Sequence, residues 1–347
     1  AAALVPRPSA KPRMSARRIA GTVLAAAAIA LAAAAWVSLH LLSARDPSAT
    51  ATIFEVPRGS TLKSVGRRLE QAGIVRSGRA FELLGRIENA ASRLHFGEYE
   101  ISAAQTPCEI LERMIEGRVK TYDVTLTEGL SQREIAERLV ASGLVTADAL
   151  EAVLRDPSSP ERFGVEGPGL EGYLFPDTYR FARGLDAAEI VGALVGRFRR
   201  AWEPLAPLAA AQGLGQREVV TLASIVEKET GRAEERSLVA SVFRNRLRLG
   251  MRLESDPTVI YGIAGFDGNL RRLDLDDPSN PYNTYQITGL PPGPIASPGE
   301  ASLRAVVEPA ESEYLFFVGR GDGSHVFSRH YDDHVRAVNQ YQRRGGR

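Results

Sequence analysis

The chain has 347 residues, of which 44% are hydrophobic and 24% charged, an ordinary composition for folded domains. The 43 basic and 42 acidic residues leave a net charge of +1, so no overall positive field favours a nucleic-acid partner, and none is expected. The single cysteine, Cys108, excludes an intrachain disulfide and any zinc site built from several thiolates.

The N-terminal region combines a basic tail, residues 1–18, with an uncharged run over 19–42. At ~1.5 Å per residue, a helix over this run is long enough to cross a hydrocarbon core of ~30 Å. The uncharged run predicts a single-pass membrane anchor. The basic tail before it predicts that the N-terminus lies in the cytoplasm and that the chain after the anchor lies outside. A cleaved signal peptide with small residues at 33–35 is the alternative, and Met14 is a second candidate for the start of the chain.

A short polar linker, residues 43–52, precedes two similar segments at 56–75 and 126–145. Both predict a strand end, a glycine turn, a Ser or Thr at a helix start, an amphipathic helix and a closing glycine. With a strand-like stretch at 95–102, the first segment predicts a βααβ module over 53–121. That module is similar to LysM-type modules, which bind N-acetylglucosamine polymers. A positioning domain without sugar contact is the alternative.

Residues 122–347 predict a larger mixed α+β domain, so the expected fold class of the whole chain is α+β with one transmembrane helix. Helical periodicity covers 187–202, 216–230 and 234–248, and strand-like runs cover 173–175, 314–318 and 325–327. The segment 278–298 holds six of the 20 prolines. Their fixed φ angles predict a rigid, irregular loop of the kind that carries ligand sites.

The segment VVTLASIVEKETG, residues 219–231, offers the clearest chemistry. At about 100° per residue, its apolar side chains form one buried helical face. Glu227 falls on one edge of that face and Glu229 on the opposite edge. A carboxyl group against apolar neighbours holds its proton to higher pH, as a general acid requires. The helical pattern does not choose between the two, and ordinary surface ion pairs remain the alternative for both.

Three histidines, His325, His330 and His334, lie within ten residues of one another, with two aspartates between them. A helix is expected to begin near Asp332 as its N-cap, which would divide the histidines between strand, loop and helix. The histidine cluster raises the hypothesis of a zinc-dependent hydrolase, although the expected division of the histidines argues against a common metal site.

The second half of the chain resembles the YceG-like endolytic murein transglycosylases. The matching stretches are LEGYLFPDTY (170–179), LASIVEKET (222–230), VASVFRNRLRLGMRLESDPTVIYG (239–262), YNTYQITGLPPGPIASPG (282–299) and, more loosely, HVFSRHYDDH (325–334). The order and spacing fit from about Phe54 to the end, and an N-terminal anchor also fits. In that family the first Glu of IVEKE is catalytic, which implies that Glu227 is the catalytic residue here.

The resemblance implies a reaction as well. Glu227 would protonate the glycosidic oxygen between N-acetylmuramic acid and N-acetylglucosamine. Either Glu227 or the substrate's own acetamido group would then assist attack by the muramyl C6 hydroxyl. The product would carry a 1,6-anhydro end. Because the nucleophile belongs to the substrate, one protein carboxylate suffices, and no metal or cofactor is needed. This scheme departs from the two-carboxylate pattern of most glycosidases.

The resemblance also suggests substrate contacts, with peptidoglycan glycan strands as ligand and peptidoglycan synthases as protein partners. The expected substrate-binding residues are Tyr282, Asn283, Tyr285, Asn245, Asp256, Thr258 and Glu171. For Asp256 a turn or helix-entry role is equally expected, because Pro257 follows it, and Glu171 could equally form a buried salt bridge. The competing function is a catalytically silent peptidoglycan-binding scaffold of the elongation machinery, which would not need Glu227.

Overall fold

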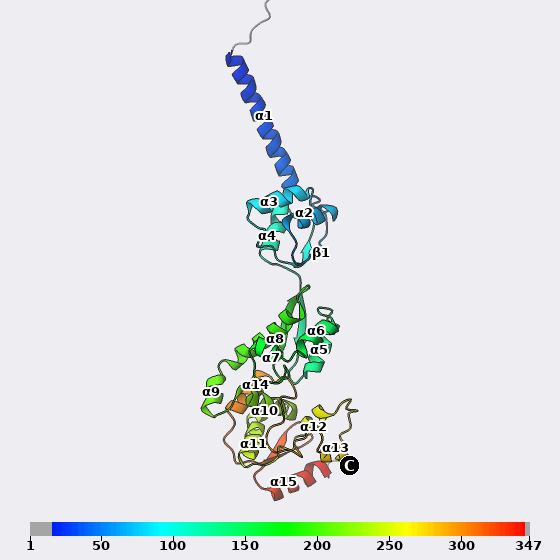
Figure 1. Ribbon diagram of the computed structural model, residues 1–347, viewed down its shortest axis with the longest axis vertical. Helices are drawn as coiled ribbons and strands as arrows, with labels where there is room; N and C mark the ends of the chain where they lie inside the picture. The colour runs from blue at the N-terminus through cyan, green and yellow to red at the C-terminus, as the bar shows by residue number, and fades with distance from the viewer. Residues whose placement is uncertain (1–15, 344–347) are drawn as a thin grey trace, which may run out of the picture. The chain divides into compact units, whose positions relative to one another are not determined.

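The computed structural model describes residues 16–343, and the chain divides into two compact units between Lys120 and Thr121 (Figure 1). Met14 and residues 1–15 as a whole lie outside the described residues. Unit 1 contains α1 (Ala16–Leu42), β1 (Thr52–Val56), α2 (Leu62–Gln71), α3 (Gly78–Ile87), β2 (Gly97–Ile101) and α4 (Pro107–Ile115).

Helix α1 contains the predicted apolar run. Its segment Ala20–Leu42 has 23 residues and a mean hydropathy of 2.1, and none of it is buried in the protein. By length and composition, α1 is therefore able to cross a membrane.

The rest of unit 1 has the predicted strand–helix–helix–strand order. Strands β1 and β2 pair in antiparallel fashion, with Thr52 opposite Ile101 and Val56 opposite Gly97. Alternate side chains of the two strands are buried against α2, α3 and α4, which gives this unit its own apolar core. The order of elements is that of the expected module, while sugar binding by it stays a prediction.

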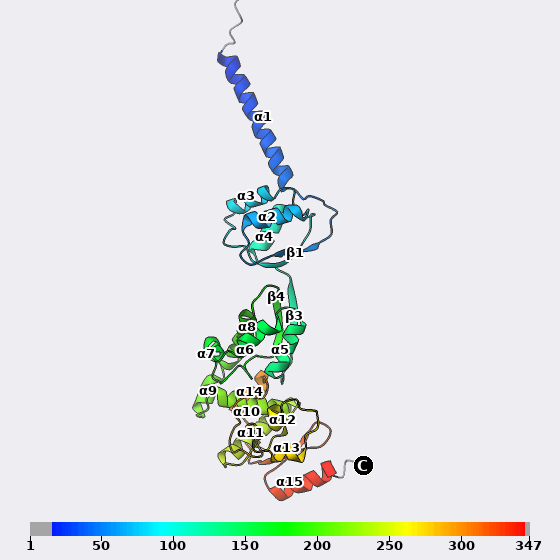
Figure 2. The same cartoon turned by 45° about the vertical axis from the view of Figure 1, so that its right-hand side comes forward.

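Unit 2 covers the chain from Thr121 onward, and it begins with a second strand–turn–helix segment, as the repeat predicts. Its elements are β3 (Thr121–Leu126), α5 (Gln132–Ala141), α6 (Ala147–Leu154), α7 (Ser159–Phe163), β4 (Asp177–Ala182), α8 (Ala187–Trp202), α9 (Ala206–Ala211), α10 (Gln216–Glu229), η1 (Ala233–Glu235), α11 (Arg236–Arg248), α12 (Asp256–Gly262), α13 (Arg272–Asp276), α14 (Glu300–Val307), β5 (Phe316–Gly319), β6 (His325–Ser328), α15 (Tyr331–Val338) and η2 (Asn339–Arg343). Strands β3 and β4 pair antiparallel, with Leu126 opposite Asp177, and Figure 2 shows them side by side.

The repeated sequence produces the same turn and cap twice. Before α2 and before α5, a glycine with positive φ lies in the turn three residues after the strand: Gly59 at 78° and Gly129 at 77°. A hydroxyl side chain then caps each helix, that of Thr61 in unit 1 and that of Ser131 in unit 2. These two features place the loop after β3 in a fixed conformation at the start of α5.

Helix α10 lies at the centre of unit 2, where it packs against α11 and α14 (Figures 1 and 2). All its residues from Val219 to Val226 are buried, because both faces of this stretch meet other elements. Its last turn emerges from the core at Glu227 and Glu229, which are only partly buried as whole residues.

The proline-rich segment is irregular, as predicted. Residues 277–299 contain no helix or strand between α13 and α14, yet most of 291–299 is buried. Two backbone hydrogen bonds join it to the loop after β3, from Gly129 N–H to Ser297 O at 2.9 Å and from Ser297 N–H to Leu130 O at 2.8 Å. The repeat loop and the proline-rich loop therefore form one fixed structure.

Two local predictions are wrong. Residues 173–175 form a turn rather than a strand, because Gly172 has a φ of 86° and reverses the chain before β4. Helix α15 begins two residues earlier than an Asp332 cap requires, with His330 at the N-cap position. The predicted division of the histidines is confirmed, with His325 in β6, His330 before α15 and His334 within it.

Candidate active site

The two glutamates at the end of α10 face different surroundings. Glu227 contacts the loop after β3, the start of α14 and Arg236 on α11. Glu229 contacts the segment that leads into α12, through a hydrogen bond from the Ser255 hydroxyl. The helical pattern predicts opposite edges for the two residues, and the structure gives each its own set of partners.

The Glu227 side chain is only 6% exposed, and both of its oxygens have partners. Oε2 accepts a hydrogen bond from the Gly299 backbone N–H at 3.0 Å, and Oε1 lies 3.4 Å from Nη2 of Arg236. Gly299 is the N-cap residue of α14, so the positive end of this helix also faces the carboxyl group. The N–H, the guanidinium and the helix dipole all stabilise negative charge at this position.

A second carboxyl group lies at the same guanidinium. Oε2 of Glu128 is 3.5 Å from Nη2 of Arg236, and the Glu128 side chain is 47% exposed, whereas that of Arg236 is 13% exposed. Burial, and then the charge of Glu227, raise the pKa of Glu128, while Arg236 opposes the shift. The site thus contains two carboxyl groups and one shared cation, with one of the carboxyls reaching solvent.

Glycines hold the backbone close to these carboxyls. A Cβ atom on Gly299 would lie 1.8 Å from Oε1 of Glu128, and one on Gly129 would lie 3.7 Å from Cγ of Glu227. Beside them, Nζ of Lys228 donates to the Gly129 carbonyl at 3.2 Å. Any side chain at 299 would therefore displace the Glu128 carboxyl from its present position.

Glu229 lines a polar cavity of about 700 Å³ that also includes Asp256, Tyr285 and Arg246. Burial raises the pKa of Glu229 to about 7, with the Ser255 hydrogen bond opposing and the charge of Asp256 adding to the shift. Tyr285 donates to Oδ1 of Asp256 at 2.7 Å. This cavity therefore contains a carboxyl group that carries its proton near neutral pH, and it unites the predicted residues Asp256 and Tyr285.

Glu171 forms a third acidic position, at the start of α5. Its carboxyl accepts two hydrogen bonds from the Gln132 N–H, at 2.9 and 3.1 Å, and one from the Tyr261 hydroxyl at 3.0 Å. Burial raises its pKa to about 7. The Tyr261 ring packs edge-on against Tyr282, with 4.8 Å between centroids. Glu171 is held by a helix N-terminus and a phenol, and not by the salt bridge that the sequence allowed.

Asn283 and Thr258 lie inside the protein. The Asn283 side chain is fully buried, and its Nδ2 donates to the carbonyls of Asp274, Leu275 and Asp277 at 3.2, 3.1 and 2.8 Å. Oγ1 of Thr258 is hydrogen-bonded to the Ser255 carbonyl at 2.7 Å. Both side chains hold the loop in place, so a contact with substrate would require them to leave these partners.

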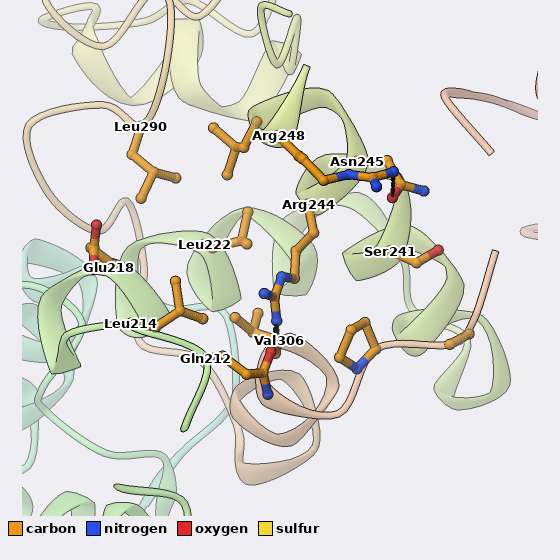
Figure 3. A pocket seen from close by; sticks show the side chains of 13 residues that line it. Gln212, Leu214, Glu218, Leu222, Ser241, Arg244, Asn245, Arg248, Leu290 and Val306 are labelled. Carbon is orange, nitrogen blue, oxygen red and sulfur yellow. Dashed lines mark hydrogen bonds between the residues drawn. The ribbon is translucent and has the colours of Figure 1, made fainter. Parts of the chain in front are cut away.

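Asn245 lies elsewhere, beside a second cavity of about 450 Å³ (Figure 3). Its Nδ2 donates to the carbonyls of Ser312 and Tyr314 at 2.9 and 3.1 Å. The close-up shows Arg244 reaching toward Gln212 across this cavity, and Leu222 of α10 lies on its wall. Glu227 lines neither cavity. The structure therefore does not place Asn245 with the other predicted site residues.

The histidines do not converge. Nδ1 of His325 lies 2.6 Å from Oε2 of Glu235, while the His334 ring stacks on Phe316 with 5.2 Å between centroids. Within residues 16–343, no three histidine, cysteine, aspartate or glutamate side chains group as metal ligands.

Sequence reasoning did not find Glu128, Arg236 or Gly299. Arg236 follows Glu227 by nine residues, but Glu128 precedes it by 99 and Gly299 follows it by 72. The only local signal was the repeat, which predicts a glycine turn at 129 and so a close backbone approach after Glu128.

Comparison with known proteins agrees with this architecture. Residues 54–340 match the YceG-like family, which is most of the chain. The chain belongs to the YceG-like family.

Several relatives carry functional names. An endolytic murein transglycosylase of Bacillus subtilis is 29% identical over 313 residues, which cover 86% of each chain. One of Streptococcus pneumoniae serotype 2 is 27% identical over 317 residues, and the matched part is 82% of this chain and 57% of that longer relative. The crystal structure of a yceG-like protein from Listeria monocytogenes is 30% identical, with a TM-score of 0.57, and covers 83% of this chain and 98% of its own.

Proposed function

We propose that this protein is an endolytic murein transglycosylase with Glu227 as its catalytic residue. The observation that carries the proposal is the nearly buried Glu227 carboxyl, set between the Gly299 N–H and Arg236 in the segment that resembles the family's catalytic motif. Family membership and the names of the relatives support the same activity.

In the proposed reaction, the Glu227 carboxyl gives its proton to the glycosidic oxygen between N-acetylmuramic acid and N-acetylglucosamine. The bond from C1 to that oxygen breaks, and its electron pair stays with the leaving sugar as a hydroxyl. The muramyl C6 oxygen bonds to C1, and its proton returns to Glu227. After Glu227 has given up its proton, Arg236 and the Gly299 N–H stabilise the resulting negative charge. This stabilisation lowers the barrier of the bond-breaking step.

Aromatic side chains of the proline-rich loop give sugar rings a surface on which to stack. We assign this role to Tyr282 and Tyr285, which are half-buried in the proline-rich loop and therefore lose little freedom on binding. Asp256 and Glu171 each accept a hydrogen bond from a tyrosine hydroxyl and hold Tyr285 and Tyr261 in place.

The reaction is tested with purified glycan strands and the full chain in detergent. The mass of the new ends decides the reaction class: 1,6-anhydro ends indicate transglycosylation, and reducing ends indicate hydrolysis. Unchanged strands that nevertheless bind the protein would favour the silent scaffold.

We further propose that α1 anchors the protein, with the N-terminus in the cytoplasm and the catalytic unit outside, where nascent peptidoglycan lies. The length and apolar character of α1 support an anchor. A reporter active only after export, fused behind the last residue, is expected to be active. N-terminal sequencing of the mature protein that begins near Trp36 would instead show a cleaved signal peptide.

A further inference from the structure

Arg236 has two carboxyl partners at nearly equal distances. The same atom, Nη2, lies 3.4 Å from Glu227 and 3.5 Å from Glu128. Neither distance is that of a tight, charge-assisted hydrogen bond, which is ~2.7–2.9 Å. The guanidinium therefore stands between two carboxyls and is not committed to either one.

We propose that Glu128 is a positioning residue for Glu227: the two carboxyls compete for the single guanidinium of Arg236. This inference rests on the proposed function, because it concerns the residue assigned to catalysis there. When Glu227 carries the proton, Arg236 pairs with Glu128. When Glu227 gives the proton to the leaving oxygen, Arg236 moves toward the charge that develops on Glu227.

The surroundings of the pair support this competition. Besides Arg236, charged groups near the pair include Lys228, whose Nζ is held at the Gly129 carbonyl, and Glu134 of α5. Against the effect of burial, hydrogen bonds from Ser131 and then the charge of Lys228 lower the pKa of Glu134. Lys228 and Glu134 thus offset one another. Two carboxyls at one cation cannot both ionise without repulsion, which agrees with the raised pKa of Glu128.

The two carboxyl groups differ in how much of each side chain is exposed to solvent. Glu128 is about half exposed and exchanges protons with solvent, whereas the 6% exposed Glu227 is shielded from it. The absence of a side chain at Gly299 leaves the space that the Glu128 carboxyl occupies. The three residues therefore form a built arrangement in which Glu128 is placed to draw Arg236 away from Glu227.

The test is Glu128→Gln in the full chain, with Glu137→Gln as the control. Glu137 lies on the exposed side of α5, 3.8 Å from Arg133, and its substitution removes one negative charge without touching Arg236. In Glu128→Gln, Arg236 pairs with Glu227 alone and favours its ionised form. The kcat for anhydro-end release should fall about tenfold at pH 7.5 and recover to within about threefold at pH 5.5, with KM unchanged. Glu137→Gln should follow the wild-type pH profile.

A second measurement does not need activity. A raised pKa in the folded state means that Glu128 contributes stability at low pH, which is lost as pH rises through that pKa. The melting temperature of Glu128→Gln relative to wild type should therefore become more favourable from pH 5 to pH 8. A simple ion pair with Arg236 would lower the pKa of Glu128, so the difference in melting temperature would stay flat above about pH 5. A flat difference, or an unchanged pH–kcat profile, would overturn the proposal. If wild type produces no anhydro ends but the melting trend holds, the proposed function fails and the placement of Glu128 as a second carboxyl at Arg236 stands.

Discussion

The backbone N–H of Gly299 donates a 3.0 Å hydrogen bond to Oε2 of Glu227 and thereby joins the end of α10 to the start of α14. A carboxyl group at a helix N-terminus gains about 0.3–1 kcal/mol when it is charged, and more when it is partly buried. The contact therefore matters most at the moment when Glu227 has given up its proton.

Gly299→Ala tests this close approach. The new methyl group would meet the far end of the Glu128 side chain, which is flexible and half exposed, so the expected loss of stability is below about 1 kcal/mol. Activity should fall because Glu128 leaves Arg236. Calorimetry and a rate measurement on the same preparation check both parts.

Gly172→Ala is the matched comparison. Gly172 has a φ of 86°, and its Cβ would lie 2.6 Å from Cβ of Pro294 and 2.8 Å from Cγ1 of Val220, both in the protein interior. Strain and overpacking together should cost at least about 2 kcal/mol. Equal stability losses in the two glycine variants would show that the Glu128 side chain cannot move aside.

The pH dependence of stability should carry the signature of Glu229. Its folded-state pKa of about 7 lies above the ordinary value for glutamate. The group therefore contributes stability that is complete below about pH 4 and is lost as pH rises through 7. Between pH 5 and pH 8, the melting temperature of wild type should fall by more than that of Glu229→Gln. Parallel curves for the two proteins would mean that Glu229 is not held in its protonated form.

Two substitutions in the proline-rich loop should separate binding from folding. Asn283→Ala removes a fully buried amide that donates to three backbone carbonyls of the same loop and should cost about 2–3 kcal/mol of stability. Tyr285→Ala removes a half-buried ring from the cavity wall and should weaken glycan binding with little change in melting temperature. Should Tyr285→Ala unfold the protein as readily as Asn283→Ala, the Tyr285 ring would be part of the core.

The sequence predicted what depends on local pattern. The α10 helix ends within one residue of its expected limit, and the repeated glycine turns at Gly59 and Gly129 follow from residues adjacent in the chain. What it could not predict is long-range. Arg236 sits beside Glu128 only because α11 packs on α10 and the loop after β3 binds the proline-rich loop, and no short motif records that packing. For the same reason Asn283 was expected at the ligand, although its amide holds the loop from within.

The most direct test of the account compares Glu227→Gln with Glu229→Gln on purified glycan strands, with the new ends counted by mass spectrometry. Glutamine keeps the size and hydrogen bonding of glutamate but supplies no acidic proton, a change worth about 10²–10⁴ in rate for a general acid. If Glu227 is the catalytic acid, Glu227→Gln folds, binds glycan and releases almost no anhydro-ended fragments, while Glu229→Gln keeps substantial activity. The reverse result would contradict this assignment and would place the catalytic acid at Glu229, in the polar cavity with Tyr285.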